Sequence, residues 1–149
     1  MRIIVQRVSQ ANVSIDEKVV GEINNGFVLL VGVHDEDTVE TVNYMARKIA
    51  NMRIFADEDD KLNLNIDQVS GDILSISQFT LYARTKKGNR PSFIDAAKPE
   101  HGDKMYQLLN QTLRQDYGLK VAEGEFGADM QVSLINDGPV TIILDSEEA

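Results

Sequence analysis

The chain has 149 residues, a net charge of −9 and no cysteine. This length is typical of one domain, so we expect residues 1–149 to fold as a single unit. The absence of cysteine excludes disulfides and thiol catalysis and favours a reducing cytoplasm, and the acidic balance argues against an extended nucleic-acid-binding surface. The two histidines, His34 and His101, lie far apart and match no metal-ligand spacing, so we expect no metal site.

The N-terminal part predicts three strands. Residues 2–15 predict the first strand, which ends in a clear alternation of apolar and polar residues. The apolar residues earlier in this strand do not keep that alternation, which predicts a bulge near Ser9-Gln10 or burial on both faces. Residues 19–23 predict a second strand, and Asn24-Asn25-Gly26 is typical of a hairpin turn. The continuous apolar run of residues 27–33 predicts a central strand covered on both faces.

Arg7 lies among the apolar residues of the first strand. One interpretation is an edge arginine whose stem packs while its head reaches water. The other is a fixed guanidinium whose five donors hold backbone carbonyls. The residues alone favour neither interpretation.

Two helices are predicted. Residues 38–52 carry an apolar stripe at three- and four-residue steps, with Asp37 as the N-cap and Glu40 completing a capping box. Pro99 is suited to the first position of a second helix, which Gly118 would end. No apolar run approaches the roughly 18 residues of a membrane span, and no signal-peptide pattern precedes the first strand.

A buried strand at residues 73–76 leads into the polar stretch Ser77-Gln78-Phe79-Thr80. Two hydroxyls, one amide and the N–H groups from Gln78 to Thr80 would then meet at the end of a rigid strand. Such donors suit the stabilisation of an oxyanion in acyl-group chemistry. The alternative is a strand-end turn whose hydroxyls cap loose backbone groups.

The segment from Arg84 to Arg90 is a loop that also contains Lys86 and Lys87. This concentration of cations contrasts with the acidic balance of the whole chain. The loop is either solvated or contacts phosphates beside the Ser77–Thr80 stretch.

The C-terminal part predicts a strand at residues 132–135, a turn at residues 136–141 and a strand at residues 142–144. The turn contains Gly138-Pro139, and proline accepts a cis peptide bond far more readily than other residues. The segment is therefore either an ordinary hairpin turn or a stretch of special backbone geometry.

These two stretches together resemble the paired signature of the D-aminoacyl-tRNA deacylases, the D-tyrosyl-tRNA deacylase family. The signature consists of Ser77-Gln78-Phe79-Thr80-Leu81 and Asn136-Asp137-Gly138-Pro139-Val140-Thr141. Further segments agree in order along the chain: Gln6-Arg7-Val8, Arg53-Ile54-Phe55, Leu62-Asn63-Leu64-Asn65, Arg90-Pro91-Ser92-Phe93 and Ala128-Asp129-Met130-Gln131-Val132-Ser133-Leu134. Tyr82 and Arg84 differ from the residues that many relatives carry at these positions, so the resemblance does not extend to the rim of the site there.

The resemblance implies a compact, barrel-like α+β fold of mixed and antiparallel sheets with two main helices, assembled as a cytoplasmic homodimer. It implies hydrolysis of the ester between a D-amino acid, or mischarged glycine, and the 3′-terminal adenosine of tRNA. L-aminoacyl-tRNA would be rejected, as proofreading in translation requires. The implied partner is aminoacyl-tRNA, and no cofactor or membrane is involved.

The resemblance also implies roles for particular residues. Gly138-Pro139 would be a cis dipeptide that enters the partner subunit's pocket, where its carbonyls exclude L side chains and Arg7 locks it. The catalytic pocket for the ester would be bounded by four consecutive residues: Ser77, Gln78, Phe79 and Thr80. The adenine slot would be lined by two others, Phe126 and Met130.

The resemblance suggests catalysis without an essential side-chain base, in which the ribose 2′-hydroxyl helps a water attack the ester. An older view makes Thr80 a covalent nucleophile, but the sequence offers no patterned base to activate it. Two other classes of function remain open: a module that binds the tRNA end without catalysis, and a dimeric structural domain.

Overall fold

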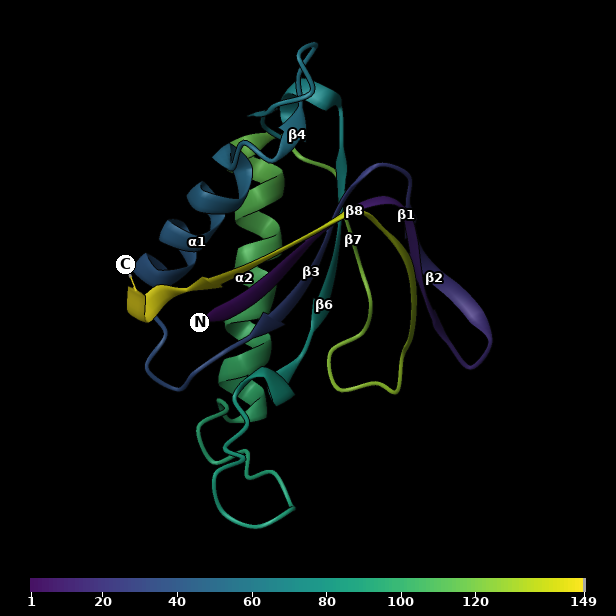
Figure 1. The fold of residues 1–149 in the computed structure, drawn as a ribbon. Helices are drawn as coiled ribbons and strands as arrows, with labels where there is room; N and C mark the ends of the chain where they lie inside the picture. Colours follow the sequence, from purple (N-terminus) through teal and green to yellow (C-terminus); the bar gives the residue numbers. More distant parts are fainter. Residues whose placement is uncertain (149) are drawn as a thin grey trace.

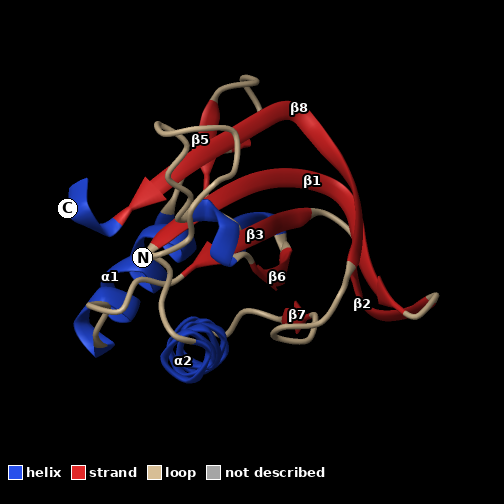
Figure 2. Ribbon diagram, turned by 90° about the horizontal axis from the view of Figure 1, so that it is seen from below, coloured by secondary structure: helices blue, strands red, loops and turns tan. Residues whose placement is uncertain are grey.

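The computed structural model describes residues 1–148, in which a mixed six-stranded sheet, a small two-stranded sheet and two α-helices make up the fold. The helices are α1 (Val39–Asn51) and α2 (Pro99–Tyr117). The strands are β1 (Arg2–Ile15), β2 (Lys18–Ile23), β3 (Gly26–Gly32), β4 (Phe55–Ala56), β5 (Leu62–Leu64), β6 (Asp72–Ser77), β7 (Val121–Glu123) and β8 (Gln131–Asp145). Both helices lie on one side of the strongly curved sheet (Figure 1), which bends almost into a barrel (Figure 2). The predicted barrel-like α+β class is confirmed.

The sheet is organised along β1. Its first half pairs with β3, its second half pairs with β2, and β8 follows it along its other edge, all antiparallel. Beyond β3, the strands β6 and β7 are added in parallel, giving the order β2-β1-β3-β6-β7. The predicted bulge near Ser9-Gln10 is present as a register shift between Val8 and Gln10.

The predicted hairpin at Asn24-Asn25-Gly26 is wrong. Both β2 and β3 run antiparallel to β1 and pair with different halves of it, so the two strands point the same way. Asn24-Asn25 therefore connects β2 to β3, which lie one after the other along β1, and the chain does not reverse there. Gly26 has φ +150°, which explains the glycine without a hairpin.

The predicted strand–turn–strand hairpin at residues 132–144 is also wrong, because β8 is one strand. In its ladder Gln6 faces Thr141 and Val8 faces Asn136, so the four residues 137–140 lie opposite Arg7 alone. These residues bulge out of the ladder, and the strand resumes on the same line. The Gly138–Pro139 peptide bond inside the bulge is cis.

The core has two parts, on the two faces of β3. Phe27 and Leu29 belong to the larger cluster between the sheet and the helices, whereas Val28 belongs to a smaller cluster inside the bend of the sheet. All three side chains are fully buried, so the prediction that this strand is covered on both faces is confirmed. β6 is buried in the same way: Ile73 lies in the larger cluster, and Leu74 and Ile76 in the smaller one.

The boundaries of the helices follow the predictions, but the cap of α1 does not. Thr38, and not Asp37, is the N-cap, and the side chains and backbone of Thr38 and Thr41 form a reciprocal capping box. Asp37 is buried and accepts hydrogen bonds from the Met1 ammonium group and the His34 N–H instead. Pro99 and Gly118 begin and end α2 as predicted.

Gly26 should be irreplaceable in the connection that aligns β3 with β6. A Cβ at this position would overlap the carbonyl oxygen of Asp72 and lie 2.7 Å from its nitrogen. We expect Gly26→Ala to lower the free energy of unfolding by roughly 3 kcal/mol, since backbone strain and overlap add. Urea denaturation measures this loss.

Gly88→Ala is the matched control for this prediction. Gly88 also has a positive φ, +70°, but a Cβ there would meet nothing within 4 Å. Its cost should be about 1 kcal/mol, from backbone conformation alone. Equal losses for the two variants would contradict the steric argument.

Candidate functional site

The central strand β6 presents the polar stretch at its C-terminal end. β6 pairs in parallel with β3 and β7, and its last residue, Ser77, is half-buried. The Gln78 N–H then donates to the Val31 carbonyl over 2.7 Å, which extends the ladder by one residue. A single 3₁₀ turn, Phe79–Leu81, follows directly. The stretch is therefore anchored to the core at one end and exposed at the other.

This anchoring corrects the expectation that all N–H groups from Gln78 to Thr80 are available. The Gln78 N–H is used by the sheet, whereas within residues 1–148 the N–H groups of Phe79 and Thr80 donate to no acceptor. Adjacent free N–H groups at the end of a rigid strand suit an anion or a developing oxyanion.

The polar stretch opens into a hollow of about 250 Å³. Its lining comes from β6, the following turn and the segment that enters β8: Ile76, Ser77, Gln78, Phe79, Phe126, Gly127, Ala128, Met130 and Val132. Five residues predicted for the site therefore meet in one pocket, although two chain segments supply them. None of the described residues that line it titrates near neutral pH.

Phe126 is held in this pocket by α2. Its ring lies 6.1 Å from that of Tyr106 and fills the space where Gly102 lacks a side chain, since a Cβ there would be 3.2 Å away. The Tyr106 hydroxyl donates to the Ser75 carbonyl over 2.7 Å, and burial raises its pKa, so it remains a donor. Tyr106 and Gly102 were not predicted as supports, and the glycine inside a helix was the available signal.

Thr80 lies outside the pocket lining. Its side chain is exposed, and its Oγ accepts a hydrogen bond from the Gln78 amide over 2.5 Å. Within residues 1–148 no histidine or carboxylate contacts this hydroxyl. The structure thus places Thr80 beside the pocket without a group that would activate it as a nucleophile.

Arg7 is a fixed guanidinium and not a solvated edge arginine. Its side chain is 13% exposed and donates to the Asp137 carbonyl over 3.1 Å and to the Ile54 carbonyl over 2.8 Å. The expectation was that Arg7 holds the carbonyls of Gly138 and Pro139. The structure shows instead that Arg7 holds the carbonyl of the residue before Gly138. A Cβ on Gly138, whose φ is +124°, would lie 3.0 Å from an Arg7 nitrogen.

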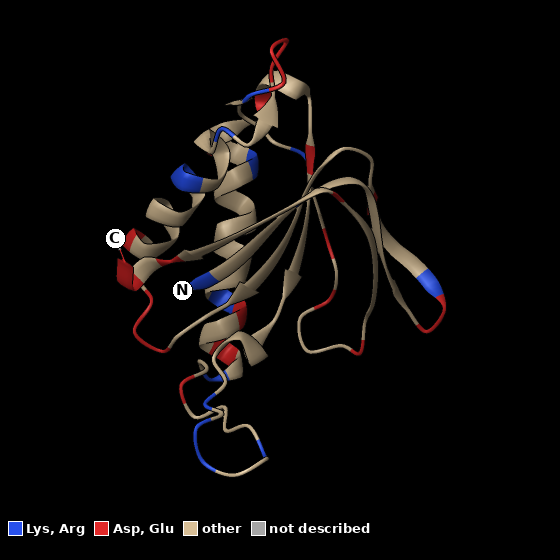
Figure 3. Cartoon of the chain, in the orientation of Figure 1, with Lys and Arg blue, Asp and Glu red and all other residues tan. Residues whose placement is uncertain are grey.

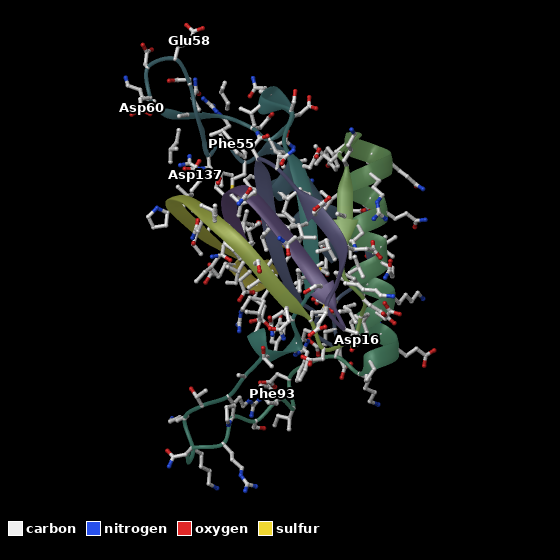
Figure 4. The ribbon with its side chains drawn as sticks, turned by 90° about the vertical axis from the view of Figure 1, so that its right-hand side faces the viewer. Asp16, Phe55, Glu58, Asp60, Phe93 and Asp137 are labelled. Carbon is white, nitrogen blue, oxygen red and sulfur yellow. The ribbon has the colours of Figure 1, made fainter. Side chains whose placement is uncertain are left out.

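The dipeptide and the pocket of one chain are separate. Gly138 and Pro139 are exposed and do not line the hollow. Asp137, next to the dipeptide, and Phe93, on the loop that follows the pocket turn, lie toward opposite ends of the sheet (Figure 4). The two halves of the predicted site are thus not brought together within one chain.

The basic loop projects from the end of the molecule near the pocket (Figure 3). A pair of backbone hydrogen bonds between Arg84 and Ser92 closes its neck. The Arg84 guanidinium also binds both oxygens of Asp95, over 2.6 and 2.8 Å, and this lowers the pKa of that carboxyl. Three exposed cations remain on the loop, and within residues 1–148 they form no ion pair: Lys86, Lys87 and Arg90.

Other hollows among the described residues are larger and carry none of the predicted pocket residues. They measure about 450 Å³ beside Gln10 and Asn24, about 540 Å³ between the end of α1 and β8, and about 440 Å³ beside His34 and Tyr82. Among the described residues, no cluster of histidines and carboxylates is arranged to hold a metal ion, and no helix is long and apolar enough to cross a membrane.

A family model described as D-Tyr-tRNA(Tyr) deacylase matches residues 4–145. The chain belongs to this deacylase family. A solved structure described as c-Myc DNA Unwinding Element Binding Protein is 39% identical to this chain. The match covers 97% of this chain and 98% of the solved chain, with a TM-score of 0.91. Another, described as a probable eukaryotic D-amino acid tRNA deacylase, is 16% identical with a TM-score of 0.85 over 96% and 97% of the two chains, and shows the shared fold.

The deacylase is an enzyme, a hydrolase of the ester bond in aminoacyl-tRNA. Hydrolysis of this ester develops negative charge on the carbonyl oxygen, which N–H donors stabilise. The turn beside the pocket carries the N–H groups of Phe79 and Thr80, which donate to no acceptor within residues 1–148, and the half-buried Phe126 and Met130 line the pocket. The residues of the pocket are therefore of the types that this substrate requires.

Thr80→Ala should retain substantial deacylase activity. The hydroxyl is exposed, bonded to Gln78 and without a base, so its loss removes no nucleophile. We expect kcat to stay within about tenfold of the wild type, measured by release of D-tyrosine from D-Tyr-tRNA. A fall of about 10⁴-fold with an unchanged unfolding midpoint would instead indicate covalent catalysis.

Proposed function

We propose that the chain removes D-amino acids and mischarged glycine from tRNA, rejects L-aminoacyl-tRNA and so proofreads translation, in the cytoplasm and as a homodimer. The observation that carries this proposal is the convergence of Ser77, Gln78, Phe79, Phe126 and Met130 on one pocket in a chain of the deacylase family.

The proposed chemistry is ester hydrolysis without a side-chain base. A water molecule attacks the ester carbonyl with help from the terminal ribose 2′-hydroxyl, and the free N–H groups of Phe79 and Thr80 stabilise the resulting oxyanion. The bond to the ribose 3′-oxygen then breaks, and that oxygen takes a proton. The lack of titratable groups among the described lining residues supports this route.

We propose that chirality is enforced by the main chain of Gly138-Pro139 from the other subunit. A wall beside the α-carbon accepts a hydrogen there but clashes with a side chain, so it tolerates any D side chain that points away. Glycine passes the same wall. Two observations support a rigid wall. The bulge lifts the dipeptide out of the ladder, and Arg7 ties the neighbouring Asp137 carbonyl and the Ile54 carbonyl together.

The separation of the dipeptide from its own pocket supports the homodimer. Among the described residues β8 pairs with β1 alone, and it exposes 51% of Ile135 and 66% of Ile143. A long edge strand with exposed apolar residues is avoided in monomers. In a two-fold dimer each dipeptide would enter the partner's pocket and both edges would be covered.

The experiment that tests the function compares D-Tyr-tRNA, L-Tyr-tRNA and Gly-tRNA as substrates. We expect release of D-tyrosine and glycine, and release of L-tyrosine slower by about 100-fold or more, as a steric overlap of about 3 kcal/mol would cause. Tight binding without release would indicate a binding module. Neither binding nor release would indicate a structural domain, and equal rates for D- and L-tyrosine would refute the wall.

Complementation between two inactive variants tests the shared site. Ala128→Trp fills the pocket, whereas Gly138→Ala forces a Cβ toward Arg7 and Val140 and displaces the dipeptide. Each variant alone should be inactive. In a randomly reassorted equal mixture, half of the dimers combine one intact pocket with one intact dipeptide, so about a quarter of wild-type activity should return.

The controls are the two variants mixed without subunit exchange and the unfolding midpoint of each variant. A mixture that stays inactive after exchange, shown by sedimentation of differently tagged subunits, would contradict a site built from two chains. Full activity of a monomer would contradict it as well.

A further inference from the structure

Two aromatic rings are exposed immediately outside the pocket. Phe79 is 57% exposed and Phe93 36% exposed, and their ring centroids lie 5.1 Å apart in an edge-to-face arrangement. The next residue, Ile94, is 72% exposed. Phe93 lies where the projecting loop joins the rest of the chain (Figure 4). Aromatic side chains left in water at a functional site indicate a ligand that covers them.

This aromatic pair connects the pocket to the basic loop. Phe79 is itself part of the pocket lining. Phe93 directly follows Ser92, whose backbone closes the neck of the basic loop. That loop carries three cations without an ion pair within residues 1–148. An apolar platform therefore lies between a site for one nucleoside and a group of charges suited to phosphates.

The combination of exposed rings and unpaired cations is typical of surfaces that bind single-stranded nucleic acid. Bases stack on the rings whatever their sequence, and the cations neutralise the phosphates between them. An apolar protein partner would gain nothing from the cations, because they would lose water without a counter-charge.

We propose that Phe79 and Phe93 form a stacking platform for the unpaired nucleotides that precede the terminal adenosine of tRNA. The proposal rests on the proposed function, which puts that adenosine in the pocket beside Phe79. The strand then leaves the pocket over the two rings, and Lys86, Lys87 and Arg90 contact its phosphates. Phe93 is a positioning residue in this arrangement, because it touches the substrate away from the ester.

Substrates of different length separate this role from catalysis. D-tyrosyl-adenosine contains the ester and the terminal nucleoside alone, whereas a D-tyrosylated cytidine-cytidine-adenosine trinucleotide also contains the nucleotides that would stack. Phe93→Ala should lower kcat/KM for the trinucleotide about 10- to 100-fold, the effect of losing one or two stacked bases. It should change kcat/KM for D-tyrosyl-adenosine by less than about twofold, since no stacking contact to that substrate is lost.

Two further variants serve as controls. Phe93→Tyr keeps an aromatic face and should keep the wild-type rate on both substrates. Leu62→Ala removes another exposed apolar side chain, 55% exposed on β5 and away from the pocket lining, and should affect neither. Equal losses on both substrates, or no loss on either, would overturn the platform.

Binding of the uncharged trinucleotide gives a second measurement that does not depend on catalysis. Its affinity should fall about tenfold or more in Phe93→Ala and should be unchanged in Phe93→Tyr. A wild type that binds the trinucleotide through Phe93 but cleaves no ester would refute the proposed function and leave the platform standing. Sedimentation that shows Phe93→Ala to be monomeric would assign the rings to a subunit contact and overturn the platform.

Discussion

The arrangement of this molecule depends on Arg7, the one residue of β1 that faces four residues of β8. A strand ladder cannot pair four residues with one, and proline has no N–H to donate, so the backbone leaves the ladder there. The Arg7 guanidinium replaces the lost ladder bonds with bonds to the carbonyls of Asp137 and Ile54. One half-buried cation thereby joins the bulge of β8 to the segment that follows α1. A lysine could not do the same, because it lacks the planar fork that reaches two carbonyls at once.

The pocket and the dipeptide lie on strands with different places in the same sheet: the pocket follows the central strand β6, and the dipeptide belongs to the outer strand β8. β6 is central and buried, so the polar residues at its end are held in place by the core. β8 is the outer partner of β1, so its bulge projects without disturbing other strands. A rigid pocket at one end and a projecting backbone elsewhere suit an active site that two copies complete. The asymmetry follows from strand order, because an insertion of this size in β3 or β6 would break pairing on both sides.

Features determined locally were predictable from the sequence, and features determined by pairing were not. The apolar stripe at three- and four-residue steps predicted α1, a continuous apolar run predicted the central strand β3, and Pro99 and Gly118 predicted the ends of α2. Asn24-Asn25-Gly26 was interpreted as a turn, and an ordinary turn was one of two interpretations of Gly138-Pro139. The residues that permit a tight turn also permit a shift along one strand or a bulge. Which of these occurs depends on β1, a distant segment. The Gln78 N–H was misjudged for the same reason, since its acceptor, Val31, belongs to β3.

The charges of this acidic chain are unevenly distributed, and one loop is basic. Acidic side chains occur over most of the molecule, including the turn at Asp57–Asp60, whereas the loop beyond the pocket is free of them (Figure 3). Asp95 at the base of that loop is neutralised by Arg84, so the cations farther along it keep their field. A loop that carries three cations besides Arg84 and no acidic residue would attract a polyanion, an effect that salt screens. The acidic composition argued against an extended interface, and the loop beside the pocket is the short basic segment that this composition leaves.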